Sequence, residues 1–301
     1  MEKLRPAIVG IAEDVAADMA EQAGEVVDFI AAFANPLPAR VIATLIGVDI
    51  AMVPQLTAWS ADIAKFIFSA RATPDKYDRA YKALMEIEVF YRQVIADHRG
   101  RPRDDMLSQM IAHEGEDGDG PLSDDEIVSM LVLFLFAGHE TTTNLITNGM
   151  LALLQNPDQM ELLRDDPGLL PGAIEEFLRY QGPVQTVVRL AKENIEMAGA
   201  TIRAGERIFA LVAASHRDRA IFERADDVDI TRQQNPHVAF GFGIHMCIGA
   251  PLARIEGQEA FRTLLTRFDN FELASPELSW RDDFVTRGLE TLPVTFRQRG
   301  A

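Results

Sequence analysis

The sequence predicts a mainly α-helical fold with small β-sheets. Apolar residues recur at three- and four-residue spacing up to Tyr180, and short β-like runs appear only after the break at Gly182-Pro183. Between Ser123 and Asn156 a helical, mostly apolar pattern continues for roughly thirty residues. A helix of that length crosses a whole domain, so we expect it to organise the fold.

The first half of the chain is predicted to be a series of helices separated by prolines and glycines. Ser123 and Glu126 form a capping box at the start of the long helix. Acidic or glycine-rich runs at 100–102 and 114–120 are expected to be surface loops. The helical patterns before the long helix cover residues 4–19, 36–47, 54–70 and 74–99.

The second half combines short strands with a glycine-rich loop and a final helix. The loop covers 235–249 and the helix 251–268, while β-like runs are expected at 186–190, 195–197 and 207–212. No linker, low-complexity segment or internal repeat divides the sequence. We therefore expect a single domain over residues 1–301.

Composition excludes several classes of partner. The formal net charge of −17 repels phosphate backbones and anionic lipid headgroups, so we expect neither nucleic acid nor membrane as a partner. The most apolar stretch, 127–136, is about half the length needed to cross a bilayer. One cysteine excludes an intramolecular disulfide and fits a reducing compartment. With no export signal in the opening residues, these features predict a cytoplasmic protein.

The lone thiol, Cys247, lies in a loop rich in glycine immediately before a helix. The positive end of the helix dipole favours a thiolate there, and a thiolate is the form that ligates a metal. A dinucleotide-binding loop is excluded because Met246 stands where that fingerprint needs a glycine. A buried, inert cysteine is the alternative that the loop alone leaves open.

Two further motifs lie upstream. The first contains Gly138, which makes a long helix less stable by about 1 kcal/mol than an alanine would. Its presence suggests that another group approaches the backbone there. His139 and Glu140 do not form a zinc helix, since position 143 is threonine. The second motif is Glu176 with Arg179, a spacing that taken alone is typical of a surface ion pair.

Taken in order, the segments 137–142, 176–179 and 240–249 resemble the oxygen-activation helix, the Glu-x-x-Arg helix and the haem loop of the cytochrome P-450 superfamily, in its bacterial form. The resemblance implies that fold, with the long central helix over a haem b, and makes Cys247 the iron ligand. It also implies that Thr141 donates a hydrogen bond where dioxygen is activated and that Glu140 relays protons. A threonine bonded to its own helix and a solvated glutamate are the alternative. The further cofactor-binding residues that it implies are Arg189 and His245 at the propionates, with Phe240, Gly249, Ala137 and Gly138.

The family pattern also predicts differences in this chain. Met1 falls inside the pattern, so the family's N-terminal portion is expected to be absent. Asp227 stands where many members have an arginine that completes the Glu176 and Arg179 cluster, and Arg232 is not expected to replace it. His216 stands at a common asparagine position.

Two functions from different classes follow. The first is a monooxygenase that hydroxylates a hydrophobic small molecule with dioxygen, taking electrons from a ferredoxin or flavodoxin-type donor and its reductase. Val187, Val188 and the apolar residues before Gly138 are expected to line its substrate pocket. The alternative is a catalytically inactive truncated fragment or a haem-binding remnant.

Overall fold

The computed structural model describes residues 2–69, 73–115 and 120–300. Each predicted helical pattern corresponds to a helix of the structure, although position 70 and most of the acidic run at 114–120 lie outside the described residues. The helices are α1 (Arg5–Ala20), α2 (Pro36–Ile46), α3 (Val53–Phe68), α4 (Lys76–Gly100), α5 (Met106–Ala112), α6 (Asp124–Gln155), α7 (Pro157–Asp165), α8 (Leu170–Gln181), α9 (Val212–Ser215) and α10 (Ala250–Arg267). Tighter or wider turns occur at Glu2–Leu4, Ile30–Ala34, Ile50–Met52, Pro167–Leu169 and Gly243–His245.

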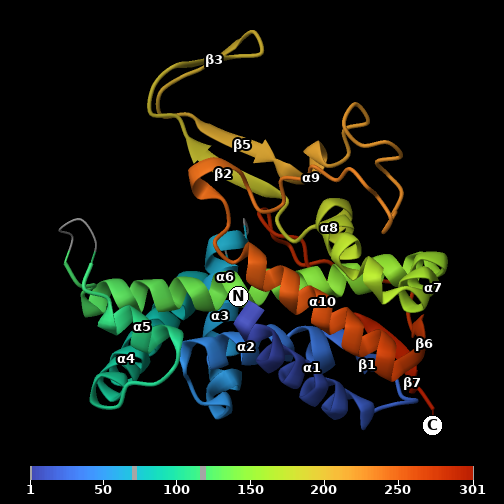
Figure 1. Cartoon of the computed structure of the whole chain (residues 1–301). Coiled ribbons are helices and arrows are strands. Elements are labelled where there is room, and N and C mark those ends of the chain that lie inside the picture. Colours follow the sequence, from blue (N-terminus) through green and yellow to red (C-terminus); the bar gives the residue numbers. More distant parts are fainter. Residues whose placement is uncertain (1, 70–72, 116–119, 301) are drawn as a thin grey trace.

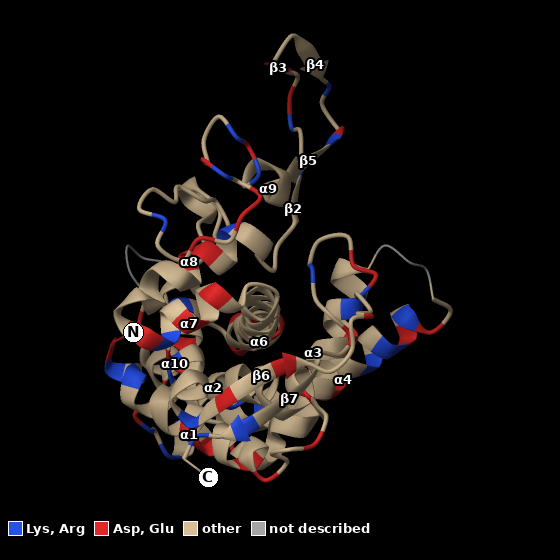
Figure 2. Cartoon of the chain, turned by 90° about the vertical axis from the view of Figure 1, so that its right-hand side faces the viewer, with Lys and Arg blue, Asp and Glu red and all other residues tan. Residues whose placement is uncertain are grey.

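Helix α6 crosses the molecule, and Figure 2 looks nearly along its axis with other helices around it. The predicted capping box is present: the Ser123 hydroxyl accepts from Glu126 N at 3.3 Å, and the Glu126 carboxylate accepts from Ser123 N at 2.8 Å. The helix ends before Pro157, which cannot continue its hydrogen bonding. Both ends are therefore determined by local sequence.

Two hydrophobic clusters form the core, and α6 takes part in both. Its N-terminal half belongs to one cluster with residues of α2, α3, α4 and α5, and its C-terminal half belongs to the other with residues of α1, α8, α10 and the largest sheet. Figure 1 shows α6 as the long horizontal helix, with α1 and α2 below it and a β-rich region above. Since one rigid helix belongs to both clusters, it fixes their relative positions.

Three small antiparallel sheets are found in the described part of the chain, which confirms the predicted class. The pairs are β2 (Thr186–Leu190) with β5 (Arg207–Leu211), and β3 (Ile195–Met197) with β4 (Ala200–Ile202); a three-stranded sheet has the order β1 (Val27–Asp28), β7 (Pro293–Gln298), β6 (Phe268–Leu273). The sequence predicted β2, β3 and β5. It missed the other strands, α5 and α9, which are short or depend on partners distant in the chain, and it extended the run of β5 by one residue into α9.

Within the described residues, no helix is both long enough and apolar enough to cross a bilayer. This includes α6, whose apolar stretch is interrupted by His139 and Glu140.

Candidate haem-binding site

A cavity of about 510 Å³ brings together residues from three separate parts of the sequence. It lies between α6, strands β2 and β5, and the loop before α10. Six of the predicted site residues line it: Ala137, Thr141, Arg189, Phe240, His245 and Cys247. We call it the thiol cavity.

The loop that carries Cys247 is shaped by two glycines with left-handed backbone, Gly241 at φ 76° and Gly243 at φ 73°. Cys247 N donates to Phe240 O at 2.8 Å, which closes the loop, and α10 begins three residues later at Ala250. The thiol is exposed. The interpretation of Cys247 as a buried, inert core residue is therefore wrong.

The same loop holds large apolar side chains away from the protein core. Phe242 is 90% exposed, Ile244 98% and Ile248 83%. Covering such side chains is favourable by about 25 cal/mol for each Å² of apolar surface that is removed from water. Beside an exposed thiol, they form a surface suited to a large, flat, apolar ligand.

One face of α6 forms the opposite wall of the thiol cavity. Ala137, Thr141 and Leu145 all line it, because residues four apart lie on the same side of a helix. The Thr141 hydroxyl donates to Ala137 O at 2.6 Å. This hydrogen bond uses the single donor of the hydroxyl, so the bond must break before Thr141 can donate to a ligand.

Gly138 and Gly249 lie beside the thiol cavity and not in its lining. A Cβ at Gly138 would come within 2.7 Å of Ile42 Cδ1, so the group that approaches this backbone from the described part of the chain is a side chain of α2. A Cβ at Gly249 would lie 3.7 Å from Cys247 Sγ, an ordinary contact.

Glu140 is not among the residues that line the thiol cavity, and it is 5% exposed. Its carboxylate accepts a hydrogen bond from Arg281 at 2.7 Å. Asp283 lies near the pair, and burial raises the pKa of its carboxyl, with the negative charge of Glu140 adding to the effect. The alternative of a solvated Glu140 is therefore wrong.

The strand β2 presents alternate side chains to the thiol cavity. Val187 and Arg189 line it, whereas Val188 lies on the other face of the strand, since successive residues of a strand point to opposite sides. The expectation that Val188 lines the pocket is wrong for this reason. Among the described residues, the Arg189 side chain donates only to the neighbouring Val188 O, at 2.9 Å, which leaves further donors for a ligand at the cavity.

Glu176 and Arg179 form a buried pair on α8, with both side chains fully buried. Arg179 donates to both carboxylate oxygens of Glu176, at 2.8 and 2.7 Å. Its other donors bind the carbonyl oxygens of His216, Ala225 and Asp227. The surface ion pair that the spacing alone suggested is therefore excluded.

Arg232 completes this cluster, contrary to expectation, because its Nε donates to Glu176 at 3.1 Å. Asp227 contributes only its backbone carbonyl. His216 Nε2 accepts from Val238 N at 3.0 Å and so anchors the loop that leads to Cys247. Burial, helped by the positive charges around it, lowers the pKa of His216 to about 4.

Sequence reasoning missed a second network behind the loop. Glu175 accepts two hydrogen bonds from Arg254, at 2.6 and 2.8 Å, and one from His237 at 3.0 Å. Burial alone would raise the pKa of Glu175, but these donors outweigh it and lower the pKa to about 2. Arg254 also lies over the Phe240 ring, 4.6 Å from its centroid. The only sequence signal was the adjacent Glu175-Glu176 pair.

The fold and the site define a mainly helical protein with an exposed thiol facing a long central helix. Residues 50–167 and 168–286 match the family model described as Cytochrome P450. The chain belongs to the cytochrome P450 family.

Relatives and solved structures agree with that assignment. The chain is 41% identical over 276 residues to a "Biotin biosynthesis cytochrome P450" of Bacillus subtilis strain 168, covering 89% of this chain and 67% of the relative. It is 36% identical to the "6-deoxyerythronolide B hydroxylase" of Saccharopolyspora erythraea, over 98% of this chain and 71% of that protein. The crystal structure of P450BioI in complex with hexadec-9Z-enoic acid ligated acyl carrier protein superposes with a TM-score of 0.91 at 38% identity, covering 98% of this chain and 75% of that one.

Proposed function

We propose that this protein is a haem-dependent monooxygenase that hydroxylates an apolar small molecule. The observation that carries the proposal is the thiol cavity, where Cys247, His245 and Arg189 face Ala137 and Thr141 of α6. The names of its relatives, which include a hydroxylase, support a monooxygenase. Family membership implies a haem-thiolate cofactor.

The residues around the thiol cavity fit such a cofactor. Cys247 offers a soft sulfur ligand for iron, and the apolar side chains of its loop are exposed at the place where a flat ring system would cover them. Arg189 and His245 would hold the propionates by charge-assisted hydrogen bonds. Phe240 and Ala137 would pack against the ring, and Gly138 and Gly249 lie beside the cavity, next to Ala137 in the chain and close to Cys247. With one cysteine in the sequence, covalent attachment through two thioethers is impossible, which favours haem b.

When bound, a thiolate-ligated haem supplies the activation of dioxygen and the transfer of one oxygen atom to substrate. The chain's own residues would orient the substrate and deliver protons. Thr141 Oγ1 lies at the cavity wall and would donate there once its hydroxyl turns away from Ala137 O, and the Glu140 carboxylate, one residue earlier, would move protons toward it from the side of Arg281. Val187, Leu145 and Ala210 give the cavity an apolar wall for a hydrophobic substrate.

The protein acts in the cytoplasm. Its electrons come from a separate ferredoxin or flavodoxin-type donor, which is reduced by its own reductase. These 301 residues contain one cysteine, too few for an iron–sulfur cluster held by four thiolates. Since α6 joins both core clusters, we treat the chain as one haem-thiolate domain.

A carbon monoxide difference spectrum of the reduced, haem-loaded protein tests the proposal. The wild-type protein is expected to give the red-shifted Soret band of a thiolate-ligated haem, and Cys247→Ala to lose it. Met246→Ala is the matched control, because it alters the neighbouring loop residue and keeps the thiol. No such band in the wild-type protein, or the same band in Cys247→Ala, would overturn the proposal.

A further inference from the structure

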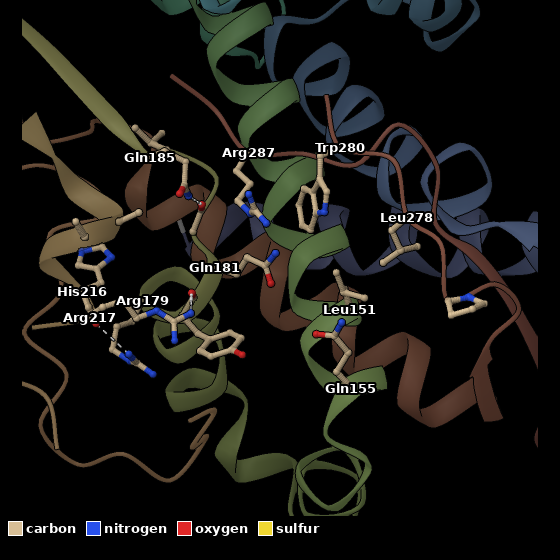
Figure 3. Close-up of a pocket in the computed structure, with 16 residues that line it drawn as sticks. Leu151, Gln155, Arg179, Gln181, Gln185, His216, Arg217, Leu278, Trp280 and Arg287 are labelled. Atoms are coloured by element: carbon tan, nitrogen blue, oxygen red, sulfur yellow. Dashed lines mark hydrogen bonds between the residues drawn. The ribbon is translucent and has the colours of Figure 1, made fainter. Parts of the chain in front are cut away.

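A second cavity, of about 680 Å³, lies among the C-terminal ends of α6 and α8, helix α9 and the segment 276–287 (Figure 3). Of the described residues that line it, only Val184 also lines the thiol cavity. Three arginines, Arg179, Arg217 and Arg287, line it, and we call it the arginine cavity. No Asp or Glu is found among its described lining residues, although the protein as a whole carries a net charge of −17.

The three arginines differ in how far their charge is neutralised. Arg179 is paired with the buried carboxylate of Glu176. Arg217 donates to Tyr180 O at 2.7 Å, and its ion pair with Asp226 is long, at 3.7 Å. The same Asp226 binds Arg219 more closely, at 2.7 Å. Arg217 is therefore only partly compensated.

Arg287 has no counterion among the described residues. Its guanidinium lies over the Trp280 ring, with Cζ 3.7 Å from the ring centroid, and its side chain makes no ion pair or hydrogen bond with that part of the chain. Burial lowers the pKa of Arg287, because the charged form loses part of its hydration. Stacking uses one face of the plane and leaves the N–H edges free to bind a ligand.

The remaining lining is suited to the body of an organic molecule. Trp280 and Leu278 lie on one side of the arginine cavity and Leu151 projects from α6, while Gln181 lies below Arg287 (Figure 3). The volume falls within the range of about 300–1,000 Å³ that is usual for small-molecule sites.

We propose that the arginine cavity is a second ligand site that binds an organic anion. Its carboxylate or phosphate group is held by Arg287, within the positive field of Arg217, and its apolar body packs against Trp280 and Leu278. This site is separate from the thiol cavity, so it does not depend on haem binding or on the proposed monooxygenase activity.

Fluorescence of Trp280 can test the site directly. The sequence has two tryptophans, and the other, Trp59, is buried on α3, so Trp59→Phe leaves Trp280 as the only indole reporter. Phenyl phosphate and benzoate are the anionic probes, and uncharged benzamide is their matched control. We expect a saturable change in Trp280 emission with at least one of the anions and none with benzamide. The stronger of the two responses distinguishes a phosphate from a carboxylate ligand.

Variants separate binding by Arg287 from general effects of salt. In the Trp59→Phe background, Arg287→Gln should weaken the affinity about tenfold or more, and Arg101→Gln, a change at an exposed arginine, should leave it unchanged. As an independent readout, the anion should raise the melting temperature of the wild-type protein more than that of Arg287→Gln. The proposal is overturned if Trp280 responds to neither anion, or if Arg287→Gln binds as tightly as its parent.

Discussion

Arg281 Nη1 donates a hydrogen bond to the carboxylate of Glu140 at 2.7 Å, joining two residues that are 141 positions apart in the sequence. Glu140 is 7% exposed at its side chain, so water can replace this partner only in part. We predict that Arg281→Gln lowers the free energy of unfolding by roughly 1–3 kcal/mol at neutral pH, because it leaves a buried carboxylate unpaired.

Urea denaturation of a double-mutant cycle checks this prediction. Glu140→Gln combined with Arg281→Gln should recover part of the stability that Arg281→Gln loses, because the amide is neutral. Strictly additive effects of the two substitutions would contradict a direct coupling.

Thr141 lines the thiol cavity while its hydroxyl is bonded to Ala137 O. With the haem-loaded protein, a redox partner and a substrate, we expect Thr141→Ala to keep consuming reduced nicotinamide but to release more of the electrons as hydrogen peroxide. The cause is the loss of the donor that directs a proton at this position. Product formed per nicotinamide consumed is the measurement, and Thr141→Ser, which keeps the hydroxyl, is the control. Full coupling in Thr141→Ala would show that the residue is only structural.

The side chains of Glu176 and Arg179 are fully buried and are joined by two hydrogen bonds. Removing one partner leaves an uncompensated buried charge, so Glu176→Ala or Arg179→Ala should cost about 3–5 kcal/mol of folding stability, seen as a low yield of folded protein. Arg262→Ala is a suitable control, because Arg262 and Glu259 are also three residues apart on a helix but Arg262 is half exposed. Its loss should be under about 1 kcal/mol. Equal effects at the two sites would contradict the assigned role of burial.

His216 is 2% exposed, and its pKa is lowered from an ordinary value of 6.5 to about 4 by burial and neighbouring positive charges. Between pH 6.5 and pH 4 the imidazole is protonated in the unfolded chain but stays neutral in the folded protein. The free energy of unfolding that His216 contributes is therefore complete above pH 6.5 and declines as the pH falls toward 4. Each pKa unit corresponds to about 1.4 kcal/mol at most. His216→Asn keeps an acceptor for Val238 N and cannot titrate, so its unfolding free energy should fall less over this window. Parallel pH profiles for the two proteins would contradict the assignment.

Local sequence determined most of the helical framework. The pattern predicted between Ser123 and Asn156 is α6, because the capping box at one end and Pro157 at the other act within a few residues. The loop before α10 could also be recognised from local sequence, because its glycines adopt left-handed backbone angles that strain other residues. Cys247 stood out because no other thiol is present.

Tertiary structure alone decided which distant groups meet. Arg232 reaches Glu176 across 56 residues, and Glu175 collects Arg254 and His237, although nothing in the spacing of these residues pairs them. Strands β6 and β7 were likewise invisible, because a strand is stabilised by neighbours supplied from elsewhere in the chain. Helical periodicity and caps act over one or two turns, whereas ion pairs and sheet partners depend on where the folded backbone brings side chains together in space.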